Sequence, residues 1–206
     1  MFKKFKEKNI LKKIDAFRPL DGWLTDNEAL GLYTIAHNLH RDATVVEIGS
    51  WQGKSTYCIA KGLVSGKVYA IDPFNADAGF DVGSEQEYQQ KKGDKNLLQI
   101  FQQNMQQLKV FDKIIIKKGY SYQFANDFDA IDFLFIDGDH SIKGCISDFD
   151  LYSPKIIKGG FIAFHDYYED RNELGPTYVI KNIVSKSGNF KFFKQYDTLW
   201  IAEKIT

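Results

Sequence analysis

Five short apolar runs alternate along the chain with stretches that are long enough to form helices. They cover residues 44–48, 68–71, 113–117, 131–136 and 160–164. Few polar positions interrupt these runs, which is typical of strands that are buried on both faces. Strands that alternate with helices form βαβ units, so the pattern predicts an α/β fold with a doubly wound sheet and helices on both faces.

Helical and hairpin patterns fill much of the remaining chain. Residues 25–28 form a capping box, and the apolar residues that follow predict a helix over 26–38. Residues 86–108 are rich in Gln and carry an apolar stripe, which predicts a helical stretch with one solvated face. Residues 190–194 and 198–202 flank a short turn and predict an antiparallel hairpin at the sheet edge.

Length and composition indicate one globular domain with a small-molecule partner. The chain has 206 residues, of which 44% are hydrophobic and 26% charged. These values permit one sizeable core. Lys and Arg together number 27, as do Asp and Glu, so no overall basic field favours nucleic acid as a partner.

The first 13 residues differ from this balance because they contain six lysines and one glutamate. We expect a basic N-terminal segment over 1–19, containing a solvated helix, followed by one domain over 20–206; a membrane-surface or partner-binding arm is the alternative. Apolar runs are too short for a transmembrane helix or a secretory signal, which predicts a cytoplasmic protein. Cys58 and Cys145 lack metal-type spacing and are expected to be buried free thiols.

The sequence VVEIGSWQGKST, over residues 45–56, predicts a ligand site where a strand turns into a helix. Such a corner presents free backbone N–H groups at the carboxyl edge of the sheet. A dinucleotide site would need close glycines, but Trp51 stands where the second glycine should be. Glu47 would repel a diphosphate and attract an ammonium group. Asp72 ends the next strand, where an acid can accept both hydroxyls of a ribose.

A second polar cluster follows the strands over 131–136 and 160–164. Asp137, Asp139 and His140 follow the first of these strands, and His165 and Asp166 follow the second. Carboxyl ends of neighbouring parallel strands meet at one edge, so this cluster should lie near the corner. Carboxylates crowded in this way repel one another unless a cation lies among them.

The motif E-x-G-x-x-x-G over 47–53, followed by Asp72, resembles the first two motifs of the class I S-adenosylmethionine (SAM)-dependent methyltransferases. The resemblance covers about residues 20–201 and implies a Rossmann-like sheet in the order 3-2-1-4-5-7-6 with strand 7 antiparallel. In that family the turn after strand three lies near adenine, which here indicates Tyr120 and Ser121. The implied cofactor-binding residues are Glu47, Gly49, Ser50, Gly53, Ser55, Asp72, Ser121 and Asp137.

The second cluster resembles that of the metal-dependent O-methyltransferases, which act on catechols or on hydroxyls of sugars and natural products. Carried over, Asp137, His165 and Asp166 would be metal ligands, with Mg²⁺ or Mn²⁺ as the ion. Imidazole is a poor ligand for Mg²⁺, so a softer divalent ion, or no metal, is the alternative. His140 lies where the sugar type has a histidine base, and an imidazole with a pKa of ~6.5 can accept a proton at neutral pH.

The resemblance thus implies a SAM-dependent O-methyltransferase for a small or sugar-like acceptor, open at the pocket or completed by a second copy of the chain. Trp23 is a candidate pocket wall, and the segments over 20–38 and 74–88 could cover the pocket. Tyr167, Tyr168 and Arg171 line the acceptor pocket or belong to a surface loop. Asp148 and Asp150 are expected to be solvated or paired with lysine.

Structural roles are the alternative for each site residue. Gly49 and Gly53 could only close a turn, Glu47 could pair with a lysine, and Asp72 could cap a helix. His140 could be an N-cap and His165 a satisfied core residue. Two other functions stay open: a nucleotide-dependent oxidoreductase on a Rossmann sheet, and a SAM-binding protein without catalytic activity.

Overall fold

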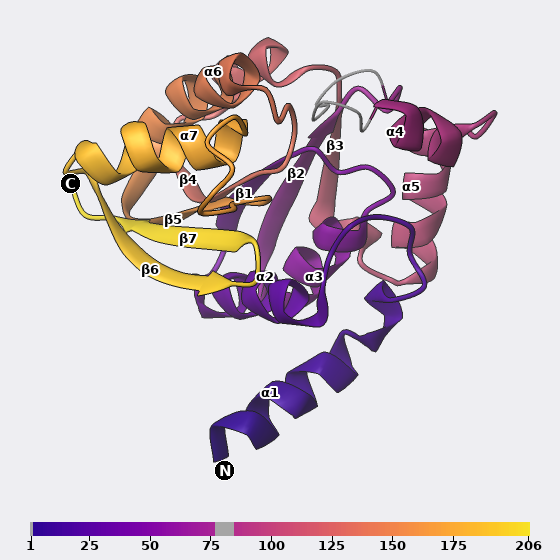
Figure 1. The fold of residues 1–206 in the computed structure, drawn as a ribbon. Helices are drawn as coiled ribbons and strands as arrows, with labels where there is room; N and C mark the ends of the chain where they lie inside the picture. Colours follow the sequence, from indigo (N-terminus) through magenta and orange to yellow (C-terminus); the bar gives the residue numbers. More distant parts are fainter. Residues whose placement is uncertain (1, 77–84) are drawn as a thin grey trace.

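One mixed sheet organises residues 2–76 and 85–206, the part of the chain that the computed structural model describes (Figure 1). The strands are β1 (Ala43–Ile48), β2 (Gly66–Asp72), β3 (Ile114–Lys118), β4 (Ile131–Ile136), β5 (Ile156–Phe164), β6 (Phe190–Tyr196) and β7 (Leu199–Lys204). Their order is β3-β2-β1-β4-β5-β7-β6, and β7 alone runs antiparallel to its neighbours β5 and β6. The predicted strand order and the antiparallel strand are confirmed.

Seven α-helices in the described residues accompany the sheet. They are α1 (Phe2–Lys13), α2 (Asp26–Asn38), α3 (Lys54–Gly62), α4 (Glu85–Lys92), α5 (Leu97–Gln107), α6 (Ile142–Tyr152) and α7 (Gly175–Asn182). The capping box at Thr25 is present. The stretch predicted over 86–108 is two helices, because Gly93 has a positive φ of 49° and the Asn96 side chain caps α5. Residues 77–84 of the segment over 74–88 lie outside the described residues.

Helices cover both faces of the sheet because successive strand residues point to opposite sides. In β4, Phe133 and Phe135 are buried in a core with α2, α3 and α5, whereas Leu134 and Ile136 are buried in a second core with α6 and α7. This two-sided burial explains why the strand sequences are continuously apolar. Cys58 and Cys145 are buried free thiols, one in each core, as predicted.

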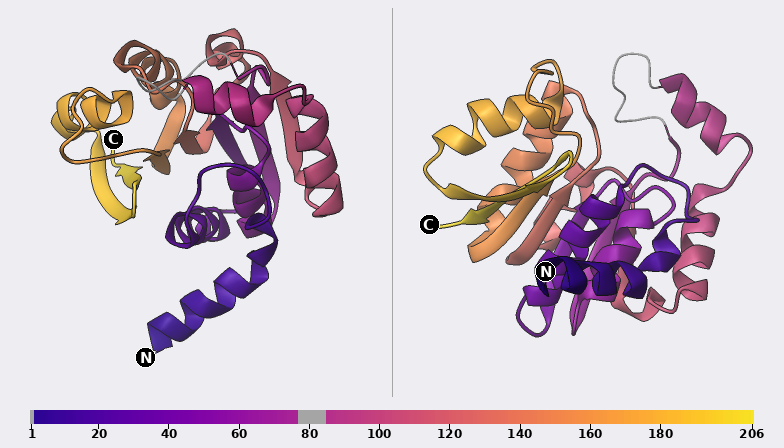
Figure 2. Two further views of the ribbon diagram at one scale, coloured as in Figure 1. Left: turned by 45° about the vertical axis from the view of Figure 1, so that its right-hand side comes forward. Right: turned by 60° about the horizontal axis from the view of Figure 1, so that its bottom comes forward.

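Helix α1 extends away from the sheet in Figure 1 and in the left view of Figure 2. The residues that follow it, Ile14 and Phe17, are buried in the core with α2 and α3. The basic segment is therefore anchored at its C-terminal end, and its role stays a prediction. Within residues 2–76 and 85–206, no helix combines the length and apolar character needed to cross a membrane.

Candidate active site

The turn after β1 brings the carboxyl ends of three strands together. Gly49 has a φ of 87°, and its N–H donates to the carbonyl of Ile71 in β2 at 2.9 Å. A Cβ atom at Gly49 would collide with the carbonyl oxygen of Asp137, which follows β4. Trp51 also has a positive φ, of 46°. Only a bare backbone at Gly49 allows β1 and the β4 terminus to approach this closely.

Asp72 fixes the same turn through both carboxylate oxygens. Its Oδ2 atom accepts hydrogen bonds from the N–H groups of Ser50 and Trp51, each at 2.8 Å, and Oδ1 accepts from Phe74 N–H at 2.5 Å. Burial raises the pKa of Asp72, and these backbone hydrogen bonds oppose the rise. Asp72 also lines the cavity described below, so the same residue holds the turn after β1 and faces the space for a ligand.

Glu47 has a different place from the one predicted. Its side chain is fully buried and does not line the cavity; its carboxylate accepts hydrogen bonds from the hydroxyls of Ser50 at 3.0 Å, Ser55 at 2.6 Å and Thr56. Burial raises the pKa of Glu47 to about 7, although the three hydroxyl groups lower it. In the structure Glu47 thus joins the first turn of α3 to β1, and its predicted attraction for a ligand's ammonium group stays a prediction.

Gly53 is likewise a packing position. It is the N-cap of α3 with a φ of 90°, and a Cβ atom there would press against the Met105 and Phe101 side chains of α5. It does not line the cavity, unlike Gly49, Ser50 and Ser55. Each glycine of the motif therefore allows a different close contact: Gly49 with the residue that follows β4, and Gly53 with α5.

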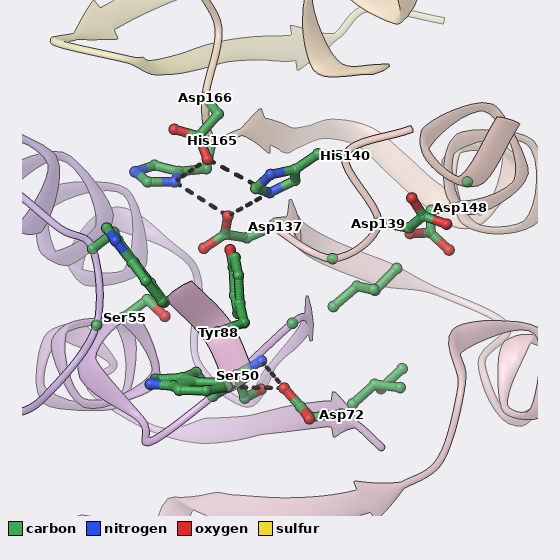
Figure 3. Close-up of a pocket in the computed structure, with 18 of the residues that line it drawn as sticks. Ser50, Ser55, Asp72, Tyr88, Asp137, Asp139, His140, Asp148, His165 and Asp166 are labelled. Atoms are coloured by element: carbon green, nitrogen blue, oxygen red, sulfur yellow. Dashed lines mark hydrogen bonds and ion pairs between the residues drawn. The ribbon is translucent and has the colours of Figure 1, made fainter. Parts of the chain in front are cut away.

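Four polar side chains converge where β4 and β5 end (Figure 3). The Nε2 atom of His140 lies 3.6 Å from Asp137 Oδ1 and 3.5 Å from Asp166 Oδ2. The Nδ1 atom of His165 lies 3.1 Å and 3.3 Å from the same two oxygens. Asp166 has a φ of 55°, a strained conformation typical of functional sites. Four of the five predicted residues therefore lie together, with each aspartate shared between two imidazoles, whereas Asp139 lies beside Asp148, apart from them (Figure 3).

His165 also faces a third carboxylate. Its Nε2 atom lies 3.3 Å from Glu28 Oε2, outside good hydrogen-bond geometry. Burial lowers the pKa of His165, but Asp137, Asp166 and Glu28 together raise it well above its usual value. Burial raises the pKa of Asp166, and hydrogen bonding with His165 brings it below its usual value. The arrangement favours an imidazolium between carboxylates.

The donor set that fits a metal ion differs by one residue from the predicted set. Ligand atoms of Asp137, His140 and Asp166 lie within 4.8 Å of one another. His140 stands in this set where the sequence predicted His165, whose ring nitrogens lie near Asp137, Asp166 and Glu28. Metal binding itself stays a prediction. Two carboxylates and one imidazole suit Mn²⁺, Fe²⁺ or Zn²⁺ better than Mg²⁺.

These groups open into one cavity of about 850 Å³, a size typical of small-ligand sites. Trp23 and Trp51 line it with Tyr88 of α4, whose hydroxyl points toward Asp137 (Figure 3). The ring centroid of Trp23 lies 5.8 Å from that of Trp51 and 4.6 Å from that of Tyr88. Among the described residues that line the cavity, nine carry carboxyl groups and two are lysines.

Comparison with known proteins identifies the family. A family profile described as a methyltransferase domain matches residues 46–167, which include the corner and the polar cluster. The chain belongs to this family. The class predicted from its motifs is confirmed by this match, and the strand order agrees with it.

The methyltransferase domain is similar to curated proteins and to several solved structures. An uncharacterised protein of Acanthamoeba polyphaga mimivirus is 32% identical over 161 residues, which cover 74% of this chain and 65% of that protein. The chain therefore spans less than two thirds of that relative. An O-methyltransferase assigned as putative, from Klebsiella pneumoniae, has a TM-score of 0.66 at 15% identity, covering 97% of this chain and 90% of the other. The O-methyltransferase TomG from Streptomyces achromogenes, solved with SAM, has a TM-score of 0.64 at 15% identity, covering 96% and 89%. At such identities the solved structures establish the fold.

The methyltransferase domain also contains site residues that sequence reasoning assigned elsewhere. Asp148 is 4% exposed and lines the cavity, where its Oδ1 atom accepts a short hydrogen bond from the Ser121 hydroxyl. The expectation that it is solvated is corrected. The sequence could have indicated this burial, because Cys145, Asp148, Phe149 and Tyr152 have the spacing of one helix face, and that face is buried.

Glu28 and the loop that contains Tyr167, Tyr168 and Arg171 differ in part from what the sequence predicted. Glu28 lines the cavity, although its sequence position indicated only a helix cap. Trp23 and Tyr168 line it as expected. Tyr167 and Arg171 are not among the lining residues: Tyr167 packs near Trp200, and the Arg171 guanidinium lies 5.6 Å from the Tyr168 ring.

Proposed function

We propose that this chain is a SAM-dependent methyltransferase that transfers a methyl group to a hydroxyl oxygen of a small-molecule acceptor. One observation carries the proposal: His140, flanked by Asp137 and Asp166, opens into the same cavity as the glycine corner and Asp72. His140, as the proton acceptor, and Asp72 with the glycine corner, as the nucleoside site, would thus face the same cavity. A cytoplasmic location, assembly with a second copy and lack of nucleic-acid binding remain predictions.

The charge of the cavity supports a cationic methyl donor. Nine carboxyl groups against two lysines disfavour a diphosphate, which would be repelled, and favour the sulfonium of SAM. Lining carboxylates, rather than the buried Glu47, therefore supply the electrostatic preference. The same charge argues against the alternative of a dinucleotide-dependent oxidoreductase.

Each part of the methyl donor has matching residues at the cavity. We assign Asp72 to the ribose hydroxyls, Ser121 to the purine, and Gly49 with Ser50 and Ser55 to the amino-acid portion. They come from the segments that follow β1, β2 and β3, with Ser55 in the first turn of α3. Trp51 and Tyr88 supply apolar walls between the two ends.

The chemical step requires deprotonation of an acceptor hydroxyl. As the new O–CH₃ bond forms and the S–CH₃ bond breaks, the hydroxyl proton passes to His140 Nε2. Asp137 and Asp166, at 3.6 Å and 3.5 Å from that nitrogen, stabilise the imidazolium that results. Positioning of both reactants in one cavity supplies the remaining acceleration.

The same donor atoms fit a divalent cation, which we propose as an assistant of the reaction. Asp137 and Asp166 would hold it, with His140 as the available third donor. When bound, a divalent cation lowers the pKa of a hydroxyl group that it contacts. One His140 nitrogen cannot bind an ion and accept a proton at the same time, so metal dependence and the role of His140 must be measured separately.

Calorimetric titration with S-adenosylhomocysteine, combined with a methyl-transfer assay, tests the proposal. The wild type should bind at micromolar concentration, and Asp72→Ala should abolish binding, whereas Asp129→Ala, at an exposed position outside the cavity, should not. A panel of phenols, sugars and aliphatic alcohols with radiolabelled SAM should give methyl ethers. Titration with EDTA should lower the rate, and normal binding by a folded Asp72→Ala variant would contradict the site.

A further inference from the structure

Glu28 is a buried carboxylate outside the part of the chain that the family profile matches. It lies in the first turn of α2, is 2% exposed and lines the cavity, whereas the profile matches residues 46–167. The proposed reaction uses His140, Asp137 and Asp166 and gives Glu28 no part. Burial of a carboxylate is costly unless hydrogen bonds or an ion pair compensate it, so its partners indicate its role.

Three hydrogen bonds hold the Glu28 carboxylate in one place. Oε1 accepts from the Thr198 N–H at 3.0 Å and from the Thr198 hydroxyl at 2.6 Å. Oε2 accepts from the Thr25 N–H at 2.8 Å, within the capping box of α2. Thr198 directly precedes β7, so the carboxylate is held both by its own helix and by a segment from the other end of the chain.

The same carboxylate pairs with the buried imidazole of His165. Glu28 Oε2 lies 3.3 Å from His165 Nε2, and the His165 residue is 4% exposed. Among the described residues, none makes a well-aligned hydrogen bond with this nitrogen, so the ion pair with Glu28 offsets its burial. Attraction between charges depends mainly on their separation, so it acts here without hydrogen-bond alignment. Glu28 therefore constrains the Nε2 side of the His165 ring.

The Nδ1 side of the ring meets the aspartates that act in the proposed reaction. Nδ1 lies 3.1 Å from Asp137 Oδ1 and 3.3 Å from Asp166 Oδ2. The same two oxygens lie 3.6 Å and 3.5 Å from His140 Nε2 (Figure 3). Two carboxylates that lie this close repel unless a group of opposite charge lies beside both. The His165 ring is such a group, so its orientation affects where both aspartates lie relative to His140.

We propose that Glu28 is a positioning residue for methyl transfer, which holds the His165 ring so that both aspartates stay beside His140. The inference rests on the proposed function. Glu28 acts through His165 and does not touch the reacting atoms. Its replacement should therefore lower turnover and leave binding of the methyl donor unchanged, since Asp72 and the glycine corner hold the donor. The competing explanation is that Glu28 only fastens α2 to the turn before β7.

A double-mutant cycle on kcat, measured in the full chain with the fastest acceptor of the panel above, tests the proposal. His165→Asn keeps an amide nitrogen near the Nδ1 position and removes the atom that faces Glu28. Glu28→Gln should lower kcat about 10- to 100-fold in the wild-type background, because small displacements of reacting groups are costly. In the His165→Asn background the same change should alter kcat by less than about twofold.

Binding of S-adenosylhomocysteine separates positioning from loss of structure. Its affinity should stay within about twofold in Glu28→Gln, and the calorimetric stoichiometry gives the fraction of competent protein. Asp26→Asn is the matched control: Asp26 is exposed in the same turn of α2, pairs with Arg18 and should leave kcat unchanged. A fall in kcat matched by a fall in stoichiometry would make Glu28 structural and overturn the proposal. Equal losses in both backgrounds, or unchanged kcat in Glu28→Gln, would also overturn it.

Nitrogen-15 NMR of the imidazole rings tests the contact without any acceptor. The His165 ring resonances, assigned by their absence in His165→Asn, should shift in Glu28→Gln and stay in place in Asp26→Asn. Resonances that do not shift would overturn the positioning role. A wild type that transfers no methyl group would instead contradict the proposed function, while a shift in these spectra would still support the contact between Glu28 and His165.

Discussion

The Oε2 atom of Glu28 lies 3.3 Å from the Nε2 atom of His165, although Glu28 belongs to the first turn of α2 and His165 follows β5. The other Glu28 oxygen accepts hydrogen bonds from Thr198, at 3.0 Å from its N–H and 2.6 Å from its hydroxyl. Three separate segments therefore meet at one buried carboxylate. All three residues line the cavity, so this junction fixes α2 and the turn before β7 beside the histidine cluster.

Glu28 should stabilise the fold with a definite pH dependence. Burial raises its pKa, but His165, Thr198 and Thr25 lower it to about 2, below the ordinary 4.5. A lowered pKa gives stability that is present above pH 4.5 and lost as the pH falls toward 2. Glu28→Gln should cost about 2 kcal/mol at pH 7 and progressively less below pH 4.5 in urea unfolding.

The exposed Glu169→Gln variant is the control for this measurement, since it should leave stability unchanged at every pH. A difference between wild type and Glu28→Gln that is constant from pH 7 to pH 3 would show that Glu28 acts through packing alone.

Glu47 should show the opposite pH dependence. Burial raises its pKa to about 7 from the ordinary 4.5. Its contribution to stability is fully present below pH 4.5 and is lost as the pH rises through 7. Relative to Glu47→Gln, the wild type should lose about 1–3 kcal/mol of unfolding free energy between pH 4.5 and pH 8. A flat difference across that range would refute burial of an ionisable group here.

Gly49 should be far less replaceable than another glycine of similar backbone conformation. Its φ is 87°, and a Cβ atom would meet the Asp137 carbonyl; Gly159 has a φ of 81° with nothing within 4 Å. Gly159→Ala should cost only backbone strain, about 1 kcal/mol, whereas Gly49→Ala should cost at least about 3 kcal/mol. Denaturant unfolding of the pair would show equal losses if the close approach were absent.

His140 should be essential for methyl transfer and dispensable for methyl-donor binding. His140→Gln should lower kcat about 10²- to 10⁴-fold and leave S-adenosylhomocysteine affinity within about twofold. His40→Gln is the matched control, because His40 is exposed and pairs with Asp132 outside the cavity. Unchanged turnover in His140→Gln would show that His140 is not the proton acceptor, and a wild type that binds S-adenosylhomocysteine without any turnover would favour a SAM-binding protein without catalysis. Loss of metal affinity in His140→Gln would make His140 a ligand.

Much of the fold followed from local pattern. Continuous apolar runs located the strands, and residues 131–136 coincide with β4, because a strand between two helical layers needs apolar residues on both faces. The capping box at residues 25–28 located the start of α2. The strand order came from the family resemblance, since pairing partners are not encoded in local pattern.

The sequence motif identified residues near the site, but it did not show which of their side chains line the cavity. Glu47 and Gly53 stand in the motif, but their side-chain surroundings, three hydroxyl groups for one and α5 for the other, depend on how α3 packs against β1 and α5. Asp148 was expected to be solvated, although it shares its helical spacing with Cys145, Phe149 and Tyr152; the structure buries it at the cavity, in contact with Ser121.

The sequence by itself determined the strands, the corner after β1 and the two polar clusters at strand ends, because each depends on residues that are close along the chain. Only the tertiary structure decided that His140 and His165 share the same two aspartates and that Glu28 and Asp148 line the cavity. Distances between side chains on separate elements follow from packing, and no local pattern records them.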